Sequence, residues 1–102
     1  MPAAAAGVRL LGPAEGSPQD AARVPTFSFR PRAGGAALSA VVAACAARKV
    51  AVRSGHMYAH RLCTALGIEP EGAEGGVVRV SAVHYNTLQE VDRLCEALDT
   101  VL

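Results

Sequence analysis

The sequence has no tryptophan and only two tyrosines and two phenylalanines among 102 residues. The sequence also has almost no excess of one charge over the other, because ten basic and nine acidic residues leave a formal net charge of +1. A nucleic-acid-binding domain is expected to carry a basic field, commonly interleaved with aromatic side chains. Neither feature is present, so the sequence does not indicate a nucleic-acid partner.

Long apolar runs and paired cysteines are missing as well. No run approaches the roughly 18 apolar residues that a membrane span requires, and residues 1–12 lack the charged and apolar regions of a secretory signal. Cys45, Cys63 and Cys95 are odd in number and form no CxxC pair, which excludes a disulfide framework and a ribbon-type zinc site. We therefore expect a cytoplasmic protein without a membrane partner, with an organelle as the alternative location.

The chain is long enough for one domain, which we place at residues 8–102 after a disordered N-terminus at residues 1–7. Hydrophobic residues make up 51% of the sequence, but alanine supplies 21 of the 102 positions. The core is therefore expected to be small. A chain of this size buries only about 60% of its unfolded surface, so we expect modest stability and support from a partner surface.

Periodicity predicts seven elements in the order β, β, α, β, α, β, α. Apolar residues spaced i, i+3, i+4 and i+7 indicate helices, and Thr87 with Glu90 forms a capping box at the start of the last one. Strands are predicted near residues 8–11, 24–29, 50–52 and 77–83, and helices near residues 38–48, 58–66 and from 87 onward. The fold class is α+β, with a small, mostly antiparallel sheet of three to four strands and about three helices packed on one face.

Arg79 is the first candidate binding residue. It lies on the polar side of the predicted strand VVRVS, and an arginine fork suits bidentate capture of a carboxylate or phosphate. The alternative is a solvated arginine, because antiparallel sheets often leave one face in water. Pattern alone does not decide between the two.

His56, His60 and Cys63 offer a second candidate, a metal site. They are spaced i, i+4 and i+7, so a helix that began early would place three ligands for zinc or another soft metal on one face. The dipeptide Ser54-Gly55 instead predicts that His56 lies in a turn, and the sequence places no carboxylate or fourth ligand beside the three. We therefore expect no metal site here.

Lys49 is the only lysine, so Schiff-base chemistry carried by this chain alone would have to use it. It follows the predicted helix end, where glycine commonly adopts the left-handed conformation, and a lysine there is ordinarily a solvated cap. The remaining residues offer no Ser-His-Asp or Cys-His group and no glycine-rich phosphate loop. The chain by itself encodes no active site, and we expect no catalytic residue in it.

Three segments carry a resemblance that covers nearly all of the chain from Val8 onward. They are VPTFSF, VAVRSGHMYAHRL and GGVVRVSAVHYNTLQEVDRLCEAL, with R-x-G-H at Arg53 to His56 and R-x-S-x-x-x-Y-N-T from Arg79 as the most specific motifs. Together they resemble the C-terminal end of class V aminotransferases, the cysteine desulfurase-like branch of the pyridoxal-phosphate enzymes of fold type I.

The resemblance implies a small C-terminal domain that folds against a large domain with the cofactor lysine. It implies substrate-binding roles for Arg79, Arg53 and His56, with Arg79 as the arginine for the substrate carboxylate. Pyridoxal phosphate is the cofactor of the family, and none is expected on this chain alone. Desulfurases carry a persulfide-forming cysteine just after the R-x-G-H turn, where this sequence has Tyr58, so sulfur relay is not expected.

Two hypotheses from different classes remain. The first is the C-terminal, substrate-carboxylate-binding part of a pyridoxal-phosphate-dependent class V aminotransferase or desulfurase-like enzyme, catalytically incomplete without its cofactor domain. The second is a free-standing, non-catalytic interaction module that docks on a complete family member or self-associates as a homodimer. The expected partners are accordingly a large cofactor-binding domain or a family member, and an amino-acid substrate in the parent enzyme.

Overall fold

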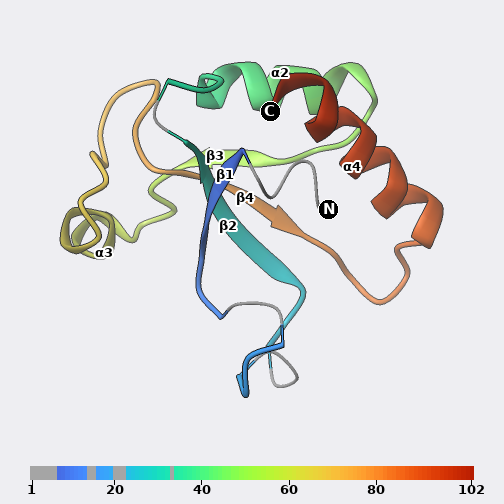
Figure 1. The fold of residues 1–102 in the computed structure, drawn as a ribbon, viewed down its shortest axis with the longest axis horizontal. Coiled ribbons are helices and arrows are strands. Elements are labelled where there is room, and N and C mark those ends of the chain that lie inside the picture. Colours follow the sequence, from blue (N-terminus) through green and yellow to red (C-terminus); the bar gives the residue numbers. More distant parts are fainter. Residues whose placement is uncertain (1–6, 14–15, 20–22, 33) are drawn as a thin grey trace.

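The computed structural model describes residues 7–13, 16–19, 23–32 and 34–102, so residues 1–6 of the predicted disordered N-terminus lie outside it. The described residues form one antiparallel sheet of four strands and three helices (Figure 1). This confirms the predicted α+β fold and the order of its seven elements. The strands are β1 (Val8–Leu11), β2 (Thr26–Pro31), β3 (Arg53–Gly55) and β4 (Val77–Ser81). The helices are α2 (Leu38–Ala47), α3 (His60–Ala65) and α4 (Leu88–Val101).

The strands are arranged in the order β1-β2-β4-β3, with every neighbouring pair antiparallel. β4 is therefore an interior strand and β3 is an edge strand. Side chains alternate between the two faces of a strand, so Val78 and Val80 share one face while Val77, Arg79 and Ser81 share the other. The predicted alternation of burial holds only in part, because Val77 and Val78 are both buried, and β4 ends at Ser81, two residues before the predicted end of the strand.

Helices α2 and α4 cover one face of the sheet and enclose the main core. Val78 is fully buried there with Val41 of α2 and Leu98 of α4. Burying such side chains contributes about 1.5 to 3 kcal/mol each. The complete buried set of this core is Val8, Phe29, Leu38, Val41, Cys45, Val78, Ala97 and Leu98.

Helix α3 lies away from α2 and α4 (Figure 1) and packs on the opposite side of the sheet. Its Cys63 is buried with Ile68 and Val77, and Val77 points to the face opposite Val78. Leu11 packs against the same small cluster. The expectation that the helices share one face thus holds for α2 and α4, and α3 is the exception because its only buried side chain meets Val77.

The third strand lies three residues later than the sequence predicts. Val50 and Val52 are apolar and look like strand residues, but they pack against the main core as irregular backbone. The ladder instead pairs Arg53 with Arg79 and Gly55 with Val77. The hydrogen-bonded pairing with β4 determines where β3 begins, and the strand propensity of the local sequence does not contain that information.

Caps fix the ends of the helices. Thr87 and Glu90 form the predicted capping box at α4, and the carboxylate of Glu74 accepts hydrogen bonds from the backbone N–H groups of Leu38 and Ser39 at the start of α2. Lys49 follows the C-terminal end of α2 with φ = 60°, as the sequence predicts. Within the described residues, no helix combines the length and apolarity needed to cross a bilayer.

Candidate functional site

Arg53 and Arg79 are brought together on the face of the sheet opposite α2 and α4, which α3 covers at Leu11 and Val77 and which we call the open face. They are direct partners across β3 and β4, and directly opposed residues of an antiparallel pair project to the same side. Arg79 is half-buried and Arg53 is exposed. Among the described residues, neither guanidinium has a hydrogen-bonding or ion-pairing partner. Arg53 and Arg79, two of the three predicted site residues, therefore form a cross-strand pair whose guanidinium N–H donors are free.

Ser28 extends this pair across the sheet. It is the partner of Arg79 on β2 and of Leu11 on β1, so the row across the open face reads Leu11, Ser28, Arg79 and Arg53. In the next row the hydroxyl of Thr26 donates to that of Ser81 at 3.4 Å. The surroundings of Arg79 thus offer hydroxyl groups and a second guanidinium, which suits an anionic ligand.

His56, the third predicted site residue, lies in the turn directly after β3. Its Nδ1 accepts a hydrogen bond from the backbone N–H of Tyr58 at 3.1 Å, and its Nε2 lies 4.0 Å from the carboxylate of Glu71. The imidazole is therefore engaged with the turn and with the loop before β4. The geometry supports His56 as a residue that holds the turn beside the arginine pair.

The same turn contains two residues in the left-handed region that are not glycine. Met57 has φ = 51° and Tyr58 has φ = 64°, a conformation that costs of order 1 kcal/mol or more at each residue. The side chain of Tyr58 is fully exposed, at 101%. The turn thus presents a phenol to solvent at the position where the resemblance implies a cysteine in desulfurases.

His56, His60 and Cys63, the three residues considered as metal ligands, do not come together. Cys63 is only 5% exposed and packs with Ile68 and Val77, whereas His56 and His60 stack edge to face with centroids 5.8 Å apart. In residues 7–13, 16–19, 23–32 and 34–102, no group of three or more His, Cys, Asp or Glu side chains could hold a metal ion.

Glu71 is a residue that sequence reasoning missed. Its carboxylate lies 3.3 Å from Nε2 of His60 and also faces His56. The sequence places it in the polar run EPEGAEGG, and only the return of this loop toward α3 brings it to the histidines. No local signal in the sequence reports that return.

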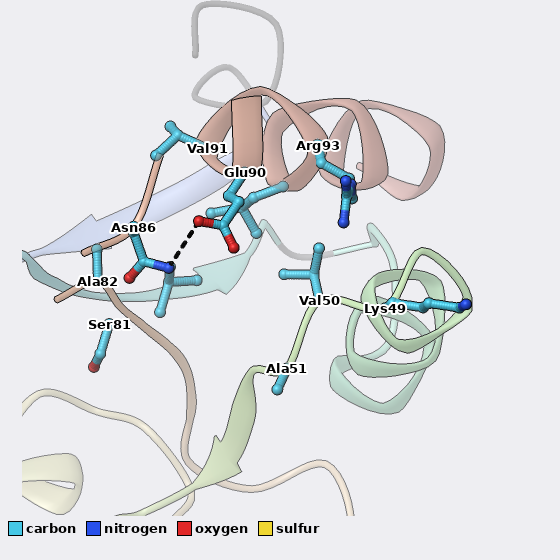
Figure 2. A pocket seen from close by; sticks show the side chains of 11 residues that line it. Lys49, Val50, Ala51, Ser81, Ala82, Asn86, Glu90, Val91 and Arg93 are labelled. Carbon is cyan, nitrogen blue, oxygen red and sulfur yellow. Dashed lines mark hydrogen bonds between the residues drawn. The ribbon is translucent and has the colours of Figure 1, made fainter. Parts of the chain in front are cut away.

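A concave region lies on the other side of the sheet from the arginine pair and is formed by the segment after α2, the end of β4 and the first half of α4 (Figure 2). Its volume is about 240 Å³. Glu90 is committed to the capping box and to Asn86, at 3.5 Å, and the ammonium end of Lys49 points away from Asn86 and Glu90 (Figure 2). Arg93 is the guanidinium that lines this hollow, on the other side of the sheet from Arg79. Its lining consists of Lys49, Val50, Ala51, Val80, Ser81, Ala82, Asn86, Glu90, Val91, Arg93 and Leu94.

The Cys45 thiol and the Lys49 ammonium group both lie away from the open face. Burial raises the pKa of the Cys45 thiol, which keeps it protonated within the core between α2 and α4. Lys49, the only lysine of the chain, lies on the helix side and not on the open face. The groups gathered around Arg79 are therefore hydrogen-bond donors, which suit the binding of an anion.

Two comparisons with known proteins bear on this site. The sequence profile of the family described as Aminotransferase class-V matches residues 4–94, which includes both motifs of the arginine pair. The chain is also 44% identical over 89 residues to the aminotransferase-like protein FGM3 of Gibberella zeae. That match covers 86% of this chain and 21% of the relative, so the chain spans about a fifth of the relative's length.

Proposed function

This chain belongs to the class V aminotransferase family, and from that premise we propose that it is the C-terminal, substrate-carboxylate-binding part of a pyridoxal-phosphate-dependent enzyme of the cysteine desulfurase-like branch. The observation that carries the proposal is the pair formed by Arg79 and Arg53, in register on the open face with free donors. A guanidinium fork matches the two oxygens of a carboxylate. Arg79 contacts the substrate carboxylate, and Arg53 and His56 line the same site.

The cofactor does not fit the residues of this chain. Pyridoxal-phosphate chemistry requires a lysine that reaches the cofactor, and Lys49 caps α2 on the other side of the sheet from Arg79. In this proposal the cofactor and its lysine belong to a larger domain, against which the open face packs. The chain alone is then catalytically incomplete.

Tyr58 limits the range of reactions that we propose for the parent enzyme. A sulfur relay needs an exposed thiol beside the R-x-G-H turn, and the only cysteine on the following helix, Cys63, is buried. The proposed parent enzyme therefore acts on an amino acid without passing sulfur to this turn. Amino-group transfer and other bond cleavages at the amino acid remain within the proposal.

The test is a titration of the purified 102-residue chain with L-alanine, followed through the backbone and arginine side-chain resonances in NMR. Shifts centred on β3, β4 and Ser28 are expected, and Arg79→Gln should abolish them. Arg93→Gln, which removes an arginine from α4, is the matched control and should leave them in place. Shifts that survive Arg79→Gln would contradict the proposal.

A separate assay tests the claim of catalytic incompleteness. The chain is incubated with pyridoxal phosphate and a panel of amino acids, and product release and covalent capture of the cofactor are measured. Neither is expected. Release of product from any amino acid would show that the chain carries chemistry that its side chains do not account for.

A second candidate function is an interaction module without catalysis. It is favoured by large apolar side chains that are exposed, above all Tyr58, Tyr85 and Leu88 at 101%, 75% and 79%. Large apolar side chains that remain exposed are candidates for contact with a partner. Light scattering of the purified chain, alone and mixed with a complete family member, tests this candidate, since a monomer that binds no family member would contradict it.

A further inference from the structure

The open face carries arginine on all four strands. Arg9 is the direct partner of Arg30 across β1 and β2, just as Arg53 is the partner of Arg79 across β3 and β4. None of the four strands contains aspartate or glutamate. The formal net charge of +1 therefore conceals an uneven distribution, with four arginines and no acidic residue on the strands themselves.

Arg9 and Arg30 are occupied within the fold. Arg9 donates to the backbone carbonyl of Leu66 at 3.3 Å, and Arg30 donates to the backbone carbonyls of Glu74 and Gly76. These bonds hold the segment between α3 and β4 against the sheet. The first arginine pair thus has a structural role and leaves few donors for a ligand.

Arg53 and Arg79 differ from Arg9 and Arg30, because the described residues supply no hydrogen-bond acceptor for either of their guanidinium groups. Like charges directly opposite each other on neighbouring strands are destabilising. Directly opposed Cα atoms lie only about 4.5 to 5.5 Å apart. Such a pair is stabilised by an anion that enters from outside, and the adjacent Ser28 on β2 adds a hydroxyl donor.

The charges of the pair indicate how many acidic groups the ligand carries. One carboxylate matches one guanidinium fork, with two parallel hydrogen bonds. An α-carboxylate on Arg79 uses that fork and leaves the charge of Arg53 unmatched. A second acidic group on the same small molecule would match it, and the flexible stems of two arginines on adjacent strands can span the carbons between two acidic groups.

We propose that the substrate of this site is an amino acid with a second acidic group, whose α-carboxylate binds Arg79 and whose side-chain acid binds Arg53. This inference rests on the proposed function, which gives the α-carboxylate to Arg79. The rival arrangement is a single carboxylate shared by both arginines. It predicts no advantage for a second acidic group.

The experiment compares acids with their neutral counterparts on the full 102-residue chain. NMR titrations at constant ionic strength use aspartate against asparagine, glutamate against glutamine, and phosphoserine against serine. A charge-assisted hydrogen bond that only the acid makes should give at least about tenfold tighter binding in one or more pairs. The acidic probe with the largest gain in affinity over its neutral counterpart identifies the preferred acidic group and its distance from the α-carboxylate.

Variants separate the two arginines. Arg53→Gln should remove the preference for the acid while alanine still shifts the resonances around Arg79. Arg79→Gln should weaken acid and neutral probes alike, and the control Arg93→Gln should change neither ratio. Constant ionic strength matters because exposed charges are screened by salt.

The outcomes of these titrations separate the claim of a second acidic group from the proposed function itself. Equal affinity for acid and neutral probes, with binding that still depends on Arg79, overturns the second acidic group and leaves the proposed function standing. Binding that survives Arg79→Gln, or no shift at the open face with any probe, overturns the proposed function and this inference with it. A preference for the acid that persists in Arg53→Gln overturns the role given to Arg53.

Discussion

Arg53 on the edge strand β3 and Arg79 on the interior strand β4 are direct cross-strand partners, and no acidic residue stands on any strand of their sheet. Folding therefore places two positive charges side by side without a counter-charge from any of the four strands. Sites that bind ligands commonly retain such unfavourable arrangements because the ligand relieves them. The pair connects the stability of the fold to its proposed function.

Removing one member of this pair should stabilise the unliganded chain. Arg53→Gln is expected to raise the free energy of unfolding by about 0.5 kcal/mol, the scale of a cross-strand repulsion, as measured by urea denaturation at low salt. Added phosphate should stabilise the wild type more than the variant. In the control Arg93→Gln, which loses an attraction to Glu90, stability should fall slightly. An Arg53→Gln variant that is less stable than wild type would contradict the account of repulsion.

Gly76 fixes the approach of β4 to the turn after β3. It has φ = 78°, and a Cβ at this position would lie 2.1 Å from the backbone carbonyl of Gly55. Gly76→Ala should therefore destabilise the chain by about 2 kcal/mol or more, through strain and overpacking. Gly72→Ala is the matched control, since Gly72 has φ = 91° and open space around it, and it should cost only about 1 kcal/mol. Equal losses in the free energy of unfolding for the two variants, measured by urea denaturation, would contradict the close approach of Gly76 to Gly55.

Lys49 offers a stabilising change. A non-glycine residue at φ = 60° costs about 1 kcal/mol, so Lys49→Gly should raise the free energy of unfolding by about 0.5 to 1 kcal/mol in thermal or urea unfolding. Arg48→Gly is the control, because Arg48 has φ = −102° and gains nothing from glycine there. If Lys49→Gly lowered stability as Arg48→Gly does, the strain assigned to Lys49 would be absent.

Glu74 makes stability depend on acid. Its pKa is lowered, first by the side-chain hydrogen bond with Ser39 and further by the backbone N–H groups of Leu38 and Ser39 and the charge of Arg30. Its stabilising contribution is therefore present above the unfolded-state pKa of about 4.3 and is lost as pH falls through the lower folded-state pKa. Glu74→Gln should be less stable than wild type at pH 7, and the two should converge toward pH 3.

The control for this profile is Glu96→Gln, which removes a carboxylate from the exposed ion pair with Arg48. Exposed pairs contribute about 0 to 1 kcal/mol, so this variant should follow the wild-type profile closely. A gap between Glu74→Gln and wild type that stayed constant from pH 7 to pH 3 would contradict the role assigned to the Glu74 carboxylate.

Local rules predicted the elements whose signals are contained within a few residues. The capping box of Thr87 and Glu90 fixed the start of α4, and the alternation of VVRVS fixed β4 and the direction of Arg79 relative to Val78. The left-handed Lys49 followed from its place after a helix. These features depend on neighbours in the sequence, which is why periodicity and capping rules find them.

Features that depend on register were not predictable in this way. Val50 and Val52 have the composition of a strand, yet the ladder with β4 begins at Arg53. The same register creates the opposition of Arg53 and Arg79 and sets Ser28 beside them. Arg53 and Arg79 are 26 positions apart and Ser28 and Arg79 are 51 positions apart, so no single segment contains that information.

Long-range loop returns were missed for the same reason. Glu71 reaches His60 and Glu74 reaches the start of α2 only because the loop before β4 folds back over the sheet. The net charge of the sequence was misleading too, since balanced totals concealed four strands that carry arginines and no acidic residue. The distribution of charge on the open face follows from topology and not from composition.

The most direct test of the account is a crystal structure of the chain grown with saturating L-alanine. The account predicts that the carboxylate lies on the open face, with both oxygens about 2.7 to 2.9 Å from the guanidinium nitrogens of Arg79. An alanine bound instead in the hollow beside Arg93, with Arg79 unliganded in the same crystal, would contradict the central claim.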